Sequence, residues 1–392
     1  MNRLAALSAP SVLGQSHGDG DGDGEFAGTY AEARDRFRRR AAEVGARLAS
    51  HPHPADPDLA CDVATLGDPA APTKIVISSG VHGVEGFAGS AVQAAWLKHA
   101  RSATLPAGLN VVLVHAINPW AFAHATRTDE RNVDVNRNLI DHAQKPDPNS
   151  DYSALVHLFH CRTWTADENL VAYRALQALQ QSADGARSAA AMAAGQSSHP
   201  DGLYYQGDAP SWSSEVLNTV LIEVLPAAQT LVWIDLHTGV GDFGEIVSID
   251  FSPPAASGGV GSRPWLSAVP ITAADSAFGI GGVPPYRGVV ARHVGQRAAD
   301  IGVKAACFVV EFGTVDDFTM FRADRLDRWL RYEGRLDPRH DALRREYRDA
   351  YVPPSPTWRE FVVRQGVALL AGAIFEAGDA YVTGSEQSGC VE

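Results

Sequence analysis

The chain has 392 residues, of which 45% are hydrophobic and 20% charged, a composition typical of a soluble globular protein. Its formal net charge of -13 argues against a nucleic-acid partner, and no apolar run is long enough to suggest a membrane span. Four cysteines lie far apart without a C-x-x-C pair, which favours reduced thiols over a disulfide framework. Because the N-terminus also matches a signal peptide poorly, we expect a cytoplasmic protein, of an oligomeric state that the sequence does not indicate.

The ends of the chain differ in composition from the rest. Residues 1–24 finish in alternating Gly and Asp, and we expect a flexible leader there. A single α/β domain is predicted over residues 25–377, followed by a flexible tail over 378–392. At the start of the domain, the pattern predicts a helix within 29–50 and an edge strand over 58–66.

The first informative stretch is a Gly-rich turn. Residues 74–78 are apolar and rich in β-branched side chains, as in a buried strand, and residues 88–97 have the spacing of a helix. His82 and Glu85 lie between them, at the strand-to-helix turn where open α/β sheets bind ligands. Imidazole nitrogen and carboxylate oxygen are zinc ligands, and a catalytic zinc site typically has three protein ligands. The turn therefore offers two candidate ligands.

A second strand, predicted over residues 109–115, implies a parallel strand-helix-strand unit. It is followed by a dense polar segment that could be an ordinary solvated loop. Asn136 and Arg137 in this segment are suited to bind a carboxylate. Asp134 is placed to accept a hydrogen bond from a metal-bound histidine and fix its orientation.

Two later strands also end in candidate site residues. The strand predicted over 230–236 leads into His237, a candidate third metal ligand, although most lone histidines are surface or core residues. Residues 253–285 are rich in Gly, Pro and Ser and predict a long loop beside the site. The last strand, over 305–310, leads into Glu311, which is either part of a structural ion pair or a general base beside a metal-bound water.

Four stretches in this order resemble the zinc carboxypeptidase superfamily of M14-like metallopeptidases, which includes the succinylglutamate desuccinylase and aspartoacylase branch. More narrowly, they resemble its DUF2817 branch. The stretches are residues 80–87, 132–138, 235–239 and 311–314. The resemblance implies an α/β fold with a mixed, mainly parallel central sheet and helices on both faces.

The resemblance also implies roles for individual residues. It makes His82, Glu85 and His237 the ligands of one zinc ion per chain, with Glu311 as general base. Asn136 and Arg137 would bind a substrate carboxylate, and Asp134 would orient the first histidine. The arginine that polarises the scissile carbonyl is Arg127 or its rival Arg131. Tyr205 is our choice for the tyrosine that contacts substrate, with Tyr204 and Tyr286 as alternatives.

The expected function is hydrolysis of a peptide or amide bond near a free carboxylate, by a zinc-activated water, in a small peptide or acyl-amino-acid substrate. One alternative is an N-deacylase of acylated amino acids, similar to aspartoacylase. Another is a non-catalytic, zinc-stabilised binding protein. A dinucleotide-dependent oxidoreductase is excluded, because residues 80–86 lack the G-x-G-x-x-G pattern.

Overall fold

A computed structural model describes residues 23–100, 105–106, 108–144, 148–254 and 286–388. Most of the expected leader, nearly all of the Gly- and Pro-rich segment 253–285, and residues 389–392 lie outside these residues. Among the described residues, no helix is both long and apolar enough to cross a bilayer.

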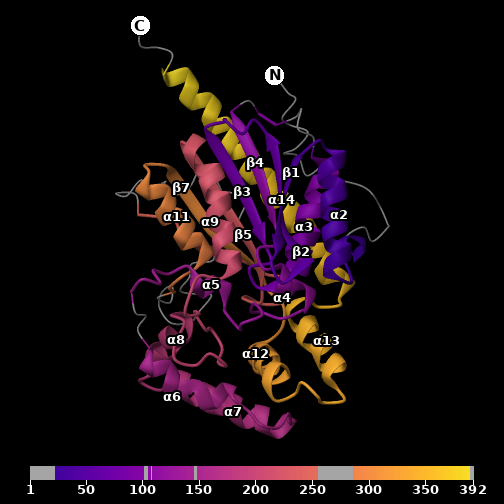
Figure 1. The fold of residues 1–392 in the computed structure, drawn as a ribbon, viewed down its shortest axis with the longest axis vertical. Coiled ribbons are helices and arrows are strands. Elements are labelled where there is room, and N and C mark those ends of the chain that lie inside the picture. Colours follow the sequence, from indigo (N-terminus) through magenta and orange to yellow (C-terminus); the bar gives the residue numbers. More distant parts are fainter. Residues whose placement is uncertain (1–22, 101–104, 107, 145–147, 255–285, 389–392) are drawn as a thin grey trace.

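The described strands form one seven-stranded sheet in the order β1-β2-β4-β3-β5-β7-β6 (Figure 1). The central strands β4, β3, β5 and β7 are parallel, whereas β1, β2 and β6 pair antiparallel at the two edges. This confirms the predicted mixed α/β fold. The strands are β1 (Arg47–His53), β2 (Asp56–Gly67), β3 (Thr73–Ser79), β4 (Leu109–His115), β5 (Thr230–Thr238), β6 (Ile246–Asp250) and β7 (Lys304–Phe312).

Helices cover both faces of the sheet. The side chains of each strand point alternately to the two faces, and each face packs against its own set of helices. In β3, Ile75 and Ile77 join a core with α2, α3 and α14, whereas Val76 joins the opposite core with α9 and α11. Both faces of the central strands are therefore apolar, as the continuous apolar runs predict. These helices are α2 (Tyr30–Glu43), α3 (Gly86–His99), α9 (Trp212–Val224), α11 (Val290–Asp300) and α14 (Pro356–Ser388).

A second group of helices lies beyond the carboxyl ends of the parallel strands, at the bottom of Figure 1. Leu155, Leu176 and Ala191 from α6, α7 and α8 pack together with Phe321 of α12 in a separate apolar cluster. The group consists of α4 (Pro119–Ala123), α5 (Val135–Asn138), α6 (Ser150–Phe159), α7 (Ala166–Gln180), α8 (Gly185–Ala193), α12 (Asp317–Tyr332) and α13 (His340–Tyr351). Short 3-10 turns are η2 (Asp23–Glu25), η3 (Gly83–Glu85) and η5 (Leu225–Ala227).

The predictions near the N-terminal end of the domain need correction. The helix expected within 29–50 ends at Glu43, because Gly45 adopts a left-handed φ of 72° and turns the chain into β1. The strand β2, which was expected to form the edge of the sheet, therefore pairs with β1 on its outer side. At the other end, α14 continues to Ser388 and so includes part of the segment 378–392, for which a flexible tail is expected. No proline interrupts this segment, and extending an existing helix costs less than starting one.

Candidate metal centre and active site

The turn after β3 has a backbone that requires glycine at two positions. Gly80 has a φ of +67°, and a Cβ added at Gly83 would lie 2.0 Å from the carbonyl carbon of Ala121. This close approach lets the turn contact the segment after β4. His82 is the N-cap residue of η3, and Glu85 ends it, so that both side chains are directed to the same side.

His82, Glu85 and His237 meet at the carboxyl end of the sheet. Their ligand atoms all lie within 4.8 Å of one another, and all three residues are buried. The Nδ1 atom of His82 lies 2.8 Å from Glu85 Oε1, and that of His237 lies 2.8 Å from Glu85 Oε2. Two imidazoles and one carboxylate are the donor set of a catalytic zinc site.

Each histidine is oriented by a second carboxylate at its other ring nitrogen. His82 Nε2 lies 3.2 Å from Asp134, and His237 Nε2 lies 2.9 Å from Asp235. Asp235 also accepts a hydrogen bond of 2.7 Å from the Ser78 hydroxyl. Such carboxylates fix the ring so that its other nitrogen can face a metal. In both histidines that nitrogen is Nδ1, which contacts Glu85. The residues present fit a zinc ion.

Sequence reasoning gave Asp134 this orienting role but missed Asp235. The signal was available, because residues two apart on a strand point to the same face. Asp235 and His237 are so placed on β5.

The charges of the site act strongly on one another. Burial opposes the ionisation of Glu85, but the positive charges of His82 and His237 outweigh it and lower its pKa. Asp134 is similarly buried, and Arg127 and His82 hold its pKa well below the usual range. For His237, burial favours the neutral ring, but Asp235 and Glu85 raise its pKa well above the ordinary value. The acidic residues thus stabilise positive charge at this centre.

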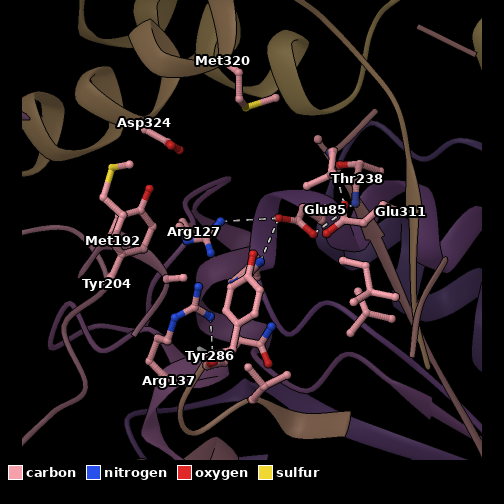
Figure 2. A pocket seen from close by; sticks show the side chains of 18 of the residues that line it. Glu85, Arg127, Arg137, Met192, Tyr204, Thr238, Tyr286, Glu311, Met320 and Asp324 are labelled. Atoms are coloured by element: carbon pink, nitrogen blue, oxygen red, sulfur yellow. Dashed lines mark hydrogen bonds and ion pairs between the residues drawn. The ribbon is translucent and has the colours of Figure 1, made fainter. Parts of the chain in front are cut away.

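Glu311 lies beside the three candidate metal ligands His82, Glu85 and His237 (the metal triad) but is not one of them. It is the register partner of His237 on the neighbouring parallel strand β7, and it lines the same cavity (Figure 2). Burial raises its pKa to about 7, and the charge of Glu85 adds to this effect. The Val240 amide donates a hydrogen bond of 3.4 Å to Glu311 Oε2. A carboxylate with a raised pKa beside a metal site can accept a proton and return it.

Of the two rival arginines, the structure brings Arg127 to the site. Its Nε lies 3.2 Å from Asp134, and its Nη1 lies 3.7 Å from Glu85. Arg131 is exposed and lies outside this cavity, where its Nη2 donates to the Pro210 carbonyl at 3.4 Å. Between the two arginines lies a turn in which the Arg131 amide donates to Asp129 Oδ1 at 2.9 Å.

Asn136 and Arg137 line the cavity from α5, whose first turn Asp134 caps. The side-chain Oδ1 of Asn136 accepts from the Val290 amide at 2.9 Å, so the side-chain Nδ2 of Asn136 remains as a donor. Arg137 is buried, and its Nε has no hydrogen-bond partner within the described residues. An unpaired buried donor is costly, and a ligand carboxylate would satisfy it.

The structure places Tyr204 and Tyr286 in the cavity wall, but not Tyr205. The Arg137 guanidinium carbon lies 4.9 Å from the centre of the Tyr286 ring and 5.7 Å from that of Tyr204. Tyr205 instead supports the site through its backbone, whose carbonyl accepts from the Asp134 amide at 2.8 Å. Tyr204 lies in a turn and adopts a left-handed φ of 58°. Such a local backbone conformation decides which of the two adjacent rings faces the cavity, and sequence alone could not resolve it for this pair.

The cavity has a volume of about 310 Å³. Helices α7 and α8 contribute Gln180, Ala189 and Met192 to its wall, and α12 contributes Met320 and Asp324. Sequence reasoning assigned none of these residues to the site. They come from helices beyond the strand ends, and no local pattern places such helices over the sheet.

Residues 26–365 match the family model described as a protein of unknown function (DUF2817). The chain belongs to the DUF2817 family. This confirms the family predicted from the four sequence stretches. No curated protein matches the chain.

Solved structures similar to this DUF2817 chain include three with low sequence identity and TM-scores below 0.5. Bovine thrombin-activatable fibrinolysis inhibitor, in complex with tick carboxypeptidase inhibitor, has 11% identity and a TM-score of 0.48, covering 92% of this chain and 99% of that one. Carboxypeptidase A from Helicoverpa armigera has 11% identity and a TM-score of 0.41, covering 88% and 80%. Succinylglutamate desuccinylase from Chromobacterium violaceum has 16% identity and a TM-score of 0.37, covering 75% and 72%.

Proposed function

We propose that this protein is a zinc-dependent hydrolase that cleaves a peptide or amide bond close to a free carboxylate. One observation carries the proposal: His82, Glu85 and His237 converge on a cavity, each histidine oriented by its own carboxylate, with Glu311 beside them. A purely structural metal site needs no such fourth carboxylate. The position of Glu311 therefore favours an enzyme over a non-catalytic binding protein.

Each site residue has a defined task in this reaction. Zinc, when bound to the triad, supplies a Lewis acid that makes a water more acidic and polarises a carbonyl. Glu311 takes the proton from the attacking water and delivers it to the leaving nitrogen. Arg127, paired with Glu85 and Asp134, points its guanidinium into the cavity and can donate to the carbonyl oxygen as negative charge develops there.

Asn136 and Arg137 bind the substrate carboxylate in this proposal. Within the described residues, Arg137 Nε has no hydrogen-bond partner and Asn136 keeps its side-chain Nδ2 as a donor, so both can donate to the substrate carboxylate. The tyrosine rings of Tyr204 and Tyr286 flank the guanidinium and limit its movement.

The second candidate is an N-deacylase of acylated amino acids. The cavity volume of about 310 Å³ favours a small substrate, since ligand pockets span roughly 300–1,000 Å³. An acyl-amino acid fits this space as well as a short peptide does. Both substrates carry the carboxylate that Arg137 would bind.

Metal analysis combined with a substrate panel tests the proposal. Purified protein should carry about one zinc per chain, and His82→Ala or His237→Ala should lose both the metal and the activity. Chelation should abolish hydrolysis, and added zinc should restore it. Faster turnover of N-acyl amino acids than of short peptides would favour the deacylase. Full zinc occupancy in both variants would contradict the site assignment.

A further inference from the structure

Asp324 is a cavity carboxylate that the proposed reaction does not use. The carboxylates lining the cavity within the described residues are Glu85, Glu311 and Asp324. Glu85 is a candidate metal ligand, and Glu311 is the proposed general base. Asp324 comes from α12, and Figure 2 shows it on the opposite side of the cavity from Arg137, with Arg127 between them. The cavity therefore carries an anion at one side and a carboxylate-binding cation at the other.

The contacts of Asp324 leave one of its oxygens open to the cavity. The Tyr351 hydroxyl donates a hydrogen bond to Oδ1, which fixes the carboxylate. Within the described residues, Oδ2 has no hydrogen-bond partner and Asp324 forms no ion pair. The nearby Arg127 is already paired with Asp134 and Glu85. Burial raises the pKa of Asp324, and the charge of Arg127 opposes this. A half-buried carboxylate of this kind is stabilised by a charged donor in the ligand.

Much of the remaining cavity wall is apolar. Met192 and Met320 line the cavity beside Asp324 in Figure 2. Three further apolar residues line the cavity: Ile249 of β6, Phe251 directly after β6, and Val309 of β7. Such walls suit uncharged side chains, whereas the polar groups are placed where they can fix the two ends of a ligand.

We propose that Asp324 binds the amino group of the substrate, so that the substrate is a short peptide with both a free amino end and a free carboxyl end. This inference rests on the proposed hydrolase function and specifies its substrate class. The carboxylate of the peptide binds at Arg137, and its ammonium donates to Asp324 Oδ2. Water adds to the carbonyl carbon, the C–N bond breaks, and Glu311 transfers the water proton to the leaving nitrogen. The products are two shorter molecules, each with an amino and a carboxyl group.

The test compares peptides that differ only in the charge of the amino end. The probes are Leu-Leu and Leu-Leu-Leu, their N-acetyl forms, and N-acetyl-Lys-Leu. Asp324→Asn keeps the size of the side chain and an acceptor for the Tyr351 hydroxyl but removes the charge. Asp317→Asn is the matched control, because it makes the same charge change on the same helix at an exposed position that does not line the cavity. Turnover is measured with the zinc-loaded proteins.

We expect the wild type and Asp317→Asn to cleave at least one free-amine peptide at least tenfold better, in kcat/KM, than its N-acetyl form. Asp324→Asn should reduce this ratio at least tenfold while it changes turnover of the N-acetyl form little. If Asp324 only supported Arg127, turnover of both forms would fall alike and the inference would be overturned. A wild-type preference for N-acetyl-Lys-Leu over N-acetyl-Leu-Leu that Asp324→Asn abolishes would overturn the assignment to the terminal amine.

Calorimetric binding to the Glu311→Gln protein separates this inference from the proposed function. Tighter binding of the free-amine peptides, lost in the Glu311→Gln/Asp324→Asn double variant, would support the subsite even if no peptide is hydrolysed by the wild type. In that case the hydrolase proposal alone would fail. Equal binding of the free and acetylated peptides, or no binding of either, would overturn the subsite.

Discussion

Glu311 has two properties that a general base requires: its carboxylate lies at the cavity, and its pKa is raised. It faces the cavity from the strand next to that of His237. Burial raises its pKa to about 7, and a positive metal ion nearby would favour its ionised form. A base must be ionised to accept the water proton, so activity should fall as the pH is lowered through the pKa of this group in the loaded enzyme.

The variant Glu311→Gln keeps the shape of the side chain but cannot accept a proton. We expect zinc content and substrate binding to remain, with kcat reduced roughly a hundredfold or more. Stopped assays of hydrolysis and metal analysis on the same preparation provide the measurement. Turnover close to that of the wild type would assign Glu311 a structural role.

Arg137 offers a second test at the scale of one residue. The variant Arg137→Ala should weaken free-acid substrates by about 2 kcal/mol or more, through the lost charge-assisted bonds. Substrates with an amidated carboxyl end should be poor for the wild type and should change little. The two substrate forms are compared in kcat/KM, because a general folding defect would depress both. Equal cleavage of both forms by the wild type would show that Arg137 does not bind a terminal carboxylate.

At the scale of elements, two connections hold the site together. The Val84 amide donates to the Thr126 carbonyl at 2.9 Å, and the Gly83 amide donates to the Arg127 carbonyl at 3.4 Å. Asp327 of α12 accepts from the Thr126 hydroxyl and, at 3.1 Å, from the Arg127 amide. The turn that carries Gly83 and the Asp327 side chain of α12 therefore hold the backbone of Arg127 from both sides. These hydrogen bonds allow Arg127 little movement.

The variant Gly83→Ala tests this contact. Its Cβ would lie 2.0 Å from the carbonyl carbon of Ala121, and backbone cannot move aside as a flexible side chain can. We expect a loss of about 1–3 kcal/mol in the free energy of unfolding, as for overpacked cores, together with weaker zinc binding. Denaturant unfolding and a zinc titration measure the two effects. Gly24→Ala is the control, because no atom lies within 4 Å of its added Cβ. Equal stability of both variants would contradict the close packing of the turn.

The elements also explain which parts of the site the sequence could predict. His237 and Glu311 at strand ends, and Glu85 in the turn that follows β3, were predicted because apolar strands are recognisable and parallel strands bring their carboxyl ends together. The choice between Arg127 and Arg131 depends on how one loop folds, and local spacing does not determine this. Asp324 comes from a helix that packs over the strand ends, and the tertiary arrangement alone gives it a role. The strand β1 was missed because its first residues, Arg47, Leu48 and Ala49, also favour a helix and follow α2 closely.

At the scale of the whole molecule, stability in acid depends on histidines buried outside the metal centre. His115 lies in β4, fully buried, with its ring stacked on Phe37 at a centroid distance of 4.5 Å. Its Nε2 lies 2.8 Å from the Ser90 hydroxyl. Burial lowers the pKa of His115 to about 4, and burial likewise lowers that of His160 to about 4. The fold thus holds both rings neutral at pH values where the unfolded chain would protonate them.

The sign of the effect follows from the proton balance. Between the unfolded value of 6.5 and the folded value of about 4, the unfolded chain binds more protons at residue 115 than the folded chain does. The contribution of His115 to stability is therefore complete above pH 6.5 and is lost as the pH falls towards 4. The full loss from this residue is about 3 kcal/mol.

The variant His115→Gln removes this titration while it retains a neutral group that can bond to Ser90. Near neutral pH we expect the variant to be less stable than the wild type, because the ring packing is lost. As the pH is lowered, the free energy of unfolding of the wild type should fall more steeply, and the difference should shrink by up to about 3 kcal/mol. Urea unfolding over this pH range, with a chelator present so that zinc release does not contribute, measures both slopes. The control His157→Gln changes an exposed histidine and should leave the slope unchanged. Parallel slopes for His115→Gln and the wild type would show that the His115 ring is protonated within the folded protein, or that its surroundings open before the whole chain unfolds.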